Sequence, residues 1–113
     1  CLIKDHLHFS FVLGIPVGMT CEERDFLFLK ESIPESATYS VAGVGRYEFK
    51  LAELSIKHGG HVRVGLEDNI YISKGVKAEG NKDLVEEVVR MASKFGRQVA
   101  TPEEARKILG LKV

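Results

Sequence analysis

Apolar and polar residues alternate in three short segments of the chain, and each segment ends near glycine. Alternation with a period of two is typical of a β-strand that has one face in a core. The starts of the segments lie about 30 and then about 24 residues apart, a spacing typical of β–α–β crossovers, so we predict parallel strands. The segments are LHFSFVLG at 7–14, ATYSVAGVG at 37–45 and HVRVG at 61–65.

A segment with apolar residues at helical spacing follows each predicted strand. We expect Thr20 to be the N-cap of the first helix, in the capping box T-C-E-E, and Asn81 to be the N-cap of the third. A fourth, short helix is predicted after the capping box T-P-E-E at 101–104, ending at Gly110. The three longer helices are expected at about 20–32, 46–58 and 82–95.

Three parallel strands do not complete a sheet, because each outer strand leaves a row of unpaired N–H and C=O groups. A closed (β/α)8 barrel takes roughly 250 residues. The 113 residues of this chain are a little under half of that length. We therefore expect an α/β fold in which residues 1–113 form a single unit, part of a TIM barrel. A small open flavodoxin-like sheet is the alternative, although such sheets usually contain about five strands.

The composition is that of an ordinary soluble globular protein, with 44% apolar and 28% charged residues. The 16 basic and 16 acidic side chains balance, and no local run of Lys and Arg stands out, so nucleic acid is disfavoured as a partner. The absence of an apolar stretch near about 18 residues and of a signal-peptide pattern disfavours a membrane or a secreted location. Two cysteines without a CxxC motif fit a reducing cytoplasm.

Two adjacent acids, Glu67 and Asp68, follow the third predicted strand, where parallel barrels carry their reactive groups. The alternation in HVRVG directs Arg63 toward the interior, and a buried guanidinium requires an anionic partner. Asp68 is the nearest candidate, but a straight strand would place it roughly 15 Å away, so pairing requires the chain to fold back after Gly65. The pair is either functional or a structural ion pair.

Glu67 is a hard oxygen donor that suits a divalent metal, but a single carboxylate does not make a site, since catalytic zinc generally takes three protein ligands. Lys74, in a predicted polar loop at 73–75, either meets an anionic substrate or is solvated. The glycine-rich segments 12–19 and 41–48 either bind phosphate through backbone N–H groups or only allow tight turns. The GVG sequence lacks the full dinucleotide fingerprint.

Four segments together resemble, in order and spacing, the carboxyl-terminal part of the β-keto acid cleavage enzymes, best known for 3-keto-5-aminohexanoate cleavage in lysine fermentation. The resemblance covers nearly the whole chain and is most specific in GGHVRVGLEDN. It implies a zinc-dependent (β/α)8 barrel, of which this chain is the last three β/α units, that converts a β-keto acid and acetyl-CoA to acetoacetate and an acyl-CoA. The segments are HFSFVLGIPVGM, ATYSVAGVGR, GGHVRVGLEDNIYISKG and ATPEEARKILGL.

The resemblance implies that Glu67 is the carboxylate ligand of Zn²⁺ and that Arg63 and Asp68 assist removal of the substrate α-proton. The two histidine ligands of the family belong to a His-x-His motif on an early strand, and HLH at 6–8 does not take their role because it precedes the strand corresponding to the sixth. We therefore expect one metal ligand of three here and a chain that is inactive alone. A cytoplasmic homo-oligomer, or a complementing amino-terminal segment, is expected to complete the barrel.

Two other functions compete with this hypothesis. The chain is alternatively a non-catalytic assembly module that completes a barrel by pairing its edges with another chain. A third interpretation is an open-sheet phosphate binder that uses the loops 12–19 and 41–48 and needs no metal.

Overall fold

The computed structural model describes residues 6–112, which contain a three-stranded parallel sheet in the order β1-β2-β3. The strands are β1 (His8–Leu13), β2 (Thr38–Gly43) and β3 (His61–Val62). His8 pairs with Thr38 and Ser40 with His61, both in parallel register. The predicted parallel strands are therefore confirmed, although β3 pairs over only two residues.

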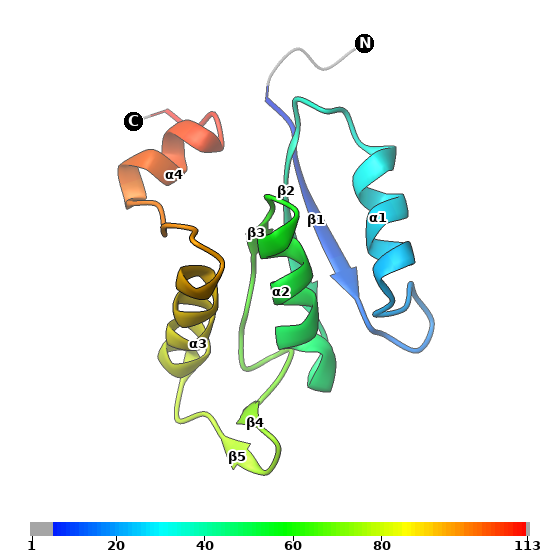
Figure 1. Cartoon of the computed structure of the whole chain (residues 1–113), viewed down its shortest axis with the longest axis vertical. Helices are drawn as coiled ribbons and strands as arrows, with labels where there is room; N and C mark the ends of the chain where they lie inside the picture. Colours follow the sequence, from blue (N-terminus) through cyan, green and yellow to red (C-terminus); the bar gives the residue numbers. More distant parts are fainter. Residues whose placement is uncertain (1–5, 113) are drawn as a thin grey trace.

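The remaining elements follow the strands along the chain (Figure 1). Along the chain, helix α1 connects β1 to β2. A short 3₁₀ turn, η1, and helix α2 connect β2 to β3. An antiparallel hairpin, β4–β5, separates β3 from α3, and α4 closes the chain. The bounds are α1 (Glu23–Ser32), η1 (Gly45–Tyr47), α2 (Glu48–Lys57), β4 (Tyr71–Ser73), β5 (Val76–Lys77), α3 (Asn81–Lys94) and α4 (Pro102–Ile108).

The core lies on one face of the sheet, between the strands and the helices α1 and α2. Phe26 of α1 and Leu51 of α2 are fully buried in it. The ring of Tyr39 lies 5.4 Å from that of Phe11 and 6.0 Å from that of Phe26, measured between ring centres. Burial of one such side chain contributes about 1.5–3 kcal/mol. The strand residues in this core are Phe11, Leu13, Tyr39 and Val41.

The opposite face of the sheet is polar toward the amino-terminal ends of its strands, whereas Val12 and Ala42 lie at the other end. His8 and Ser10 of β1 are exposed there, and the Nδ1 atom of His8 lies 2.8 Å from the Oγ1 atom of Thr38. The rings of His8 and His61 lie side by side, with centres 6.2 Å apart. Burial lowers the pKa of both imidazoles. The sheet thus has one apolar face packed against helices and one face that is polar toward the amino-terminal ends of its strands.

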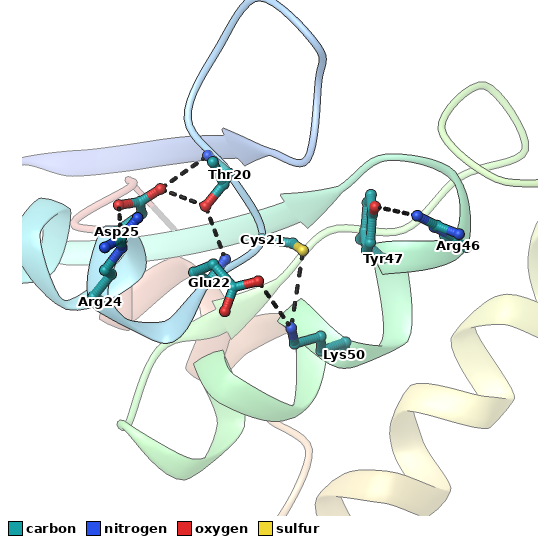
Figure 2. A network of polar contacts seen from close by, with 8 residues as sticks. All are labelled: Thr20, Cys21, Glu22, Arg24, Asp25, Arg46, Tyr47 and Lys50. Atoms are coloured by element: carbon teal, nitrogen blue, oxygen red, sulfur yellow. Dashed lines mark hydrogen bonds and ion pairs between the residues drawn. The ribbon is translucent and has the colours of Figure 1, made fainter.

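The prediction that Thr20 caps the first helix is wrong, because α1 begins at Glu23 after the N-cap Glu22. Thr20 instead donates from its backbone N and its hydroxyl to the carboxylate of Asp25, in the first turn of the helix (Figure 2). Cys21 is buried in the core rather than placed in the first helical turn. The backbone of Glu22 is extended, with φ −77° and ψ 143°, so the helix begins only at Glu23.

The prediction that Asn81 caps the third helix is also wrong. The N-cap of α3 is Gly80, and Asn81 is the first helical residue. The Oδ1 atom of Asn81 accepts a hydrogen bond of 2.8 Å from the backbone N of Leu66, in the loop after β3. A tertiary contact therefore uses the side-chain oxygen that the sequence pattern assigns to a cap.

The polar loop predicted at 73–75 is the tip of the β4–β5 hairpin, with Ser73 in β4 and Gly75 in the left-handed region at φ 79°. The capping box before α4 is confirmed, since Thr101 N donates to Glu104 and Glu104 N to Thr101. Ile108 of α4 is nevertheless 39% exposed, so the apolar side of this helix is only partly covered. None of the helices in residues 6–112 is both long enough and apolar enough to span a membrane.

Candidate functional site at the carboxyl end of the sheet

The chain reverses direction immediately after β3. The backbone N atoms of Asp68 and Asn69 donate to the carbonyl oxygen of Gly65 at 2.9 and 3.1 Å. This turn returns Asp68 to Arg63, whose Nη2 atom lies 3.0 Å from the Oδ2 atom of Asp68. The predicted pairing of Arg63 with Asp68, through a reversal after Gly65, is confirmed as a contact.

The two partners of this ion pair differ in exposure. The side chain of Asp68 is 10% exposed, whereas that of Arg63 is 46% exposed. The prediction that Arg63 is buried is therefore wrong for the structure of residues 6–112, in which its side chain is exposed. The reason is the place of Arg63 just beyond β3, an outer strand whose ladder with β2 ends at Val62.

The carboxylate of Glu67 lies directly over Gly65. A Cβ atom at position 65 would overlap both oxygens of that carboxylate, so the absence of a side chain allows this close approach. Glu67 is exposed. No group of three His, Cys, Asp or Glu side chains suited to a metal exists between residues 6 and 112. The described chain therefore offers at most part of a metal site.

A buried acid, Glu48, holds the turn 65–69 through two hydrogen bonds. Glu48 is the first residue of α2 and is only 1% exposed. Its Oε1 atom accepts from Gly65 N at 3.3 Å, and its Oε2 atom accepts from the amide of Asn69 at 2.8 Å. Burial raises the pKa of Glu48, and the charges of Asp68 and Glu67 raise it further, whereas the two hydrogen bonds lower it.

Neither Glu48 nor Asn69 is among the site residues predicted from the sequence. A signal for Glu48 exists in the sequence, because it lies at helical spacing from the buried Leu51 and Ala52, on the apolar face of α2. An acid at such a position is seldom left without a hydrogen-bond partner. No comparable signal points to the contact of Asn69 with Glu48, which lies 21 residues away in sequence.

Further hydrogen bonds fix both ends of this loop. The backbone N of Gly45 donates to the carbonyl oxygen of Asp68 at 2.7 Å. The side chain of Asn69 exchanges two hydrogen bonds with the backbone of Tyr71, at 2.6 and 3.0 Å. The positions of Glu67 and Asp68 are thus set by contacts with η1, α2 and the start of β4.

A cleft of about 920 Å³ opens between η1 and the β4–β5 hairpin. Its walls are Gly45, Arg46 and Phe49 on one side and residues 66–75 on the other, so Glu67 and Asp68 both line it. Arg46 and Lys74 are the basic residues of the lining, and both are exposed. The second glycine-rich loop thus contributes to the cleft, whereas the loop 12–19 closes on itself through the bonds Gly14 N to Met19 O and Gly18 N to Ile15 O.

Comparison with known proteins identifies close relatives of this chain. A family model described as beta-keto acid cleavage enzyme matches residues 1–111. A 3-keto-5-aminohexanoate cleavage enzyme of Fusobacterium nucleatum subsp. nucleatum is 57% identical over 110 residues, which cover 97% of this chain and 40% of that protein. A second such enzyme, from Acetoanaerobium sticklandii, is 52% identical over 109 residues, covering 96% of this chain and 40% of that protein.

A more distant relative has a different name. The 3-oxoadipate:acetyl-CoA acetyltransferase of Cupriavidus necator is 39% identical over 113 residues, covering 96% of this chain and 39% of that protein. The chain therefore spans about 40% of the length of these curated relatives.

Proposed function

Because the chain belongs to the beta-keto acid cleavage enzyme family, we propose that it forms the carboxyl-terminal part of an enzyme that converts a β-keto acid and acetyl-CoA to acetoacetate and an acyl-CoA. The observation that carries this proposal is the Arg63–Asp68 ion pair beside Glu67 at the carboxyl end of the sheet. The names of the relatives, which include a keto acid cleavage enzyme and an acetyl-CoA acetyltransferase, support the substrate classes.

Asp68 is the proposed base that removes the substrate α-proton. Its carboxylate is held by Arg63 at 3.0 Å and by the turn that Glu48 anchors, so its direction is fixed before substrate binds. A carboxylate held in one orientation near the reacting carbon is an effective general base. Arg63 is proposed to orient the carboxylate of Asp68 through the 3.0 Å contact between Nη2 and Oδ2.

Glu67 is the proposed carboxylate ligand of zinc. It is exposed at the mouth of the site, and its oxygens suit a divalent metal. The described residues do not make up a zinc site alone, so two further ligands would have to lie outside them. His6 and His8 hydrogen-bond to Thr38, at the opposite end of the strands, and do not reach Glu67. Zinc, when bound, would stabilise negative charge on the keto oxygen.

We propose that residues 1–113 form a single structural unit, which is part of the TIM barrel of a cytoplasmic enzyme. The polar sheet face, with His8, Ser10 and Ser40, suits the interior of a closed barrel, and the outer edges of β1 and β3 need partners. A second copy or a complementing amino-terminal segment would supply them. These same edges favour the second candidate function, a non-catalytic assembly module.

The test is an assay of the full-length protein that contains this chain, with acetyl-CoA and either 3-keto-5-aminohexanoate or 3-oxoadipate. Acetoacetate formation is expected, and Asp68→Asn is expected to lower kcat about 10²- to 10⁴-fold because it removes the base. Asp83→Asn on α3 is the matched control and should retain full turnover. Full activity of Asp68→Asn would show that Asp68 is not the base, and absence of any cleavage by the wild type would favour the assembly module.

A further inference from the structure

We infer that the cleft between residues 45–49 and the β4–β5 hairpin is the binding site of the CoA moiety of acetyl-CoA, with Arg46 and Lys74 as the contacts for its phosphates. This inference rests on the proposed function, because that function requires a CoA thioester to reach Asp68. It adds a location and two binding residues that the ion pair and the relatives do not supply.

The lining of the cleft suits a ligand that is partly apolar and partly anionic. Its volume of about 920 Å³ lies within the range of about 300–1,000 Å³ typical of ligand sites. Phe49, Leu66 and Ile72 provide apolar wall, and Tyr71, which is 42% exposed, presents an aromatic ring. Such walls match the alkyl and amide chain of pantetheine and the face of an adenine ring.

The two cations of the cleft are placed to bind phosphate. In the part of the chain that the structure describes, neither Arg46 nor Lys74 has a carboxylate within 4.0 Å. Lys50 and Arg63, by contrast, contact Glu22 and Asp68. Phosphate oxygens accept strong charge-assisted hydrogen bonds from guanidinium and ammonium groups.

The guanidinium of Arg46 contacts the side chain of Tyr47. Its Nη2 atom donates to the hydroxyl of Tyr47 at 2.7 Å, and its central carbon lies 4.9 Å from the centre of that ring (Figure 2). A guanidinium carries five N–H donors, so the bond to Tyr47 leaves others for a ligand. Arg46 can therefore bind an anion while it keeps its contact with Tyr47.

The cleft is continuous with the proposed catalytic residues. Glu67 and Asp68 line the same cleft as Arg46 and Lys74, and the bond from Gly45 N to Asp68 O joins the two walls. The negative charge of Glu67 disfavours phosphate beside it. A CoA thioester would therefore place its phosphates at Arg46 and Lys74 and its acyl end at the acids.

The experiment measures binding of CoA and of pantetheine, which lacks the phosphates of CoA, to the full-length protein by titration calorimetry without any keto acid. The variant Arg46→Gln/Lys74→Gln is expected to raise the Kd for CoA about 10- to 100-fold and to leave that for pantetheine unchanged. The control Lys94→Gln/Arg106→Gln removes two cations from α3 and α4 and should bind CoA like the wild type. Lys74→Gln alone, in an exposed hairpin turn, repeats the test with little risk to folding.

The outcomes separate this inference from the proposed function. An unchanged Kd for CoA in the Arg46→Gln/Lys74→Gln variant, or an equal loss in the control variant, would overturn the CoA site even if the enzyme cleaves keto acids. A wild type that fails to bind CoA would also overturn it. CoA binding that depends on Arg46 and Lys74, in a protein without cleavage activity, would support the site and contradict the proposed function.

Discussion

The side-chain amide of Asn69 donates a hydrogen bond of 2.8 Å to the carboxylate of Glu48, 21 residues earlier in the chain. With the bond from Gly65 N to the same carboxylate, this contact fastens both ends of the turn 65–69 to the start of α2. The acids that face the cleft are therefore positioned by a third acid that does not line it.

Loss of the Glu48 carboxylate is expected to destabilise the protein. Glu48→Ala leaves Gly65 N without its buried acceptor, removes one acceptor of Asn69 and opens a cavity, so the free energy of unfolding should fall by about 2–4 kcal/mol. Denaturant titration measures this change. The control is Glu53→Ala on the same helix, whose pair with Lys57 is near half exposed and should be worth less than about 1 kcal/mol.

The effect of Glu48→Ala should also depend on pH. Because burial raises the pKa of Glu48 above its ordinary value of 4.5, the folded state binds a proton that the unfolded state has already released in the interval between the two values. The stability that Glu48 contributes is thus greatest below pH 4.5 and declines as pH rises through its raised pKa. The difference in unfolding free energy between wild type and Glu48→Ala should shrink over that interval. A difference that grows with pH would contradict this assignment.

Gly65→Ala is expected to displace Glu67 with little loss of stability. The added Cβ would overlap the end of a flexible and exposed side chain, which can move away. Zinc retained by the full-length protein, measured by elemental analysis, should therefore fall while the melting temperature stays near that of the wild type. Gly80→Ala, where an added Cβ meets nothing within 4 Å, is the control. Normal zinc content in Gly65→Ala would show that the position of Glu67 does not matter for the metal.

Glu67→Gln tests the proposed ligand directly. Because the amide oxygen is neutral and a weaker metal ligand than a carboxylate, bound zinc per chain should drop at least about tenfold in dilute chelator. Glu103→Gln on the exposed surface of α4 should keep the wild-type content. Equal zinc in Glu67→Gln and wild type would remove Glu67 from the proposed metal site.

His61 is expected to make the fold sensitive to mild acid. Burial lowers its pKa below 6.5, and the positive charges of Arg97 and His8 lower it further. The stability that neutral His61 contributes is therefore present above pH 6.5 and is lost as pH falls through the lowered pKa. When the pH is lowered from 7.5 to 5, the free energy of unfolding should decrease less for His61→Asn than for the wild type. A larger loss in His61→Asn would contradict this cause.

The sequence predicts those parts of the molecule that local patterns determine. Alternation places the three strands, and the reversal after Gly65 follows from the need to give Arg63 an anion. Errors occur where another contact takes the side chain of the expected cap. Asp25, in the first turn of α1, binds Thr20, and the backbone N of Leu66, 15 residues away in sequence, binds Asn81. The contact of Glu48 with Asn69 spans 21 residues, and no local pattern reports it, although the position of Glu48 on the apolar face of α2 indicates that Glu48 is buried.

The alternation of the two sheet faces also has a consequence for folding kinetics. His8 and Thr38 pair across 30 residues of chain, so β1 and β2 must find each other through a long loop closure before their contacts form. A mispairing by one residue would bring His8 and Ser10 into the apolar layer and expel Phe9 and Phe11. Trial pairings in the wrong register would therefore dissociate quickly, and the slow search is expected to end in a single productive alignment.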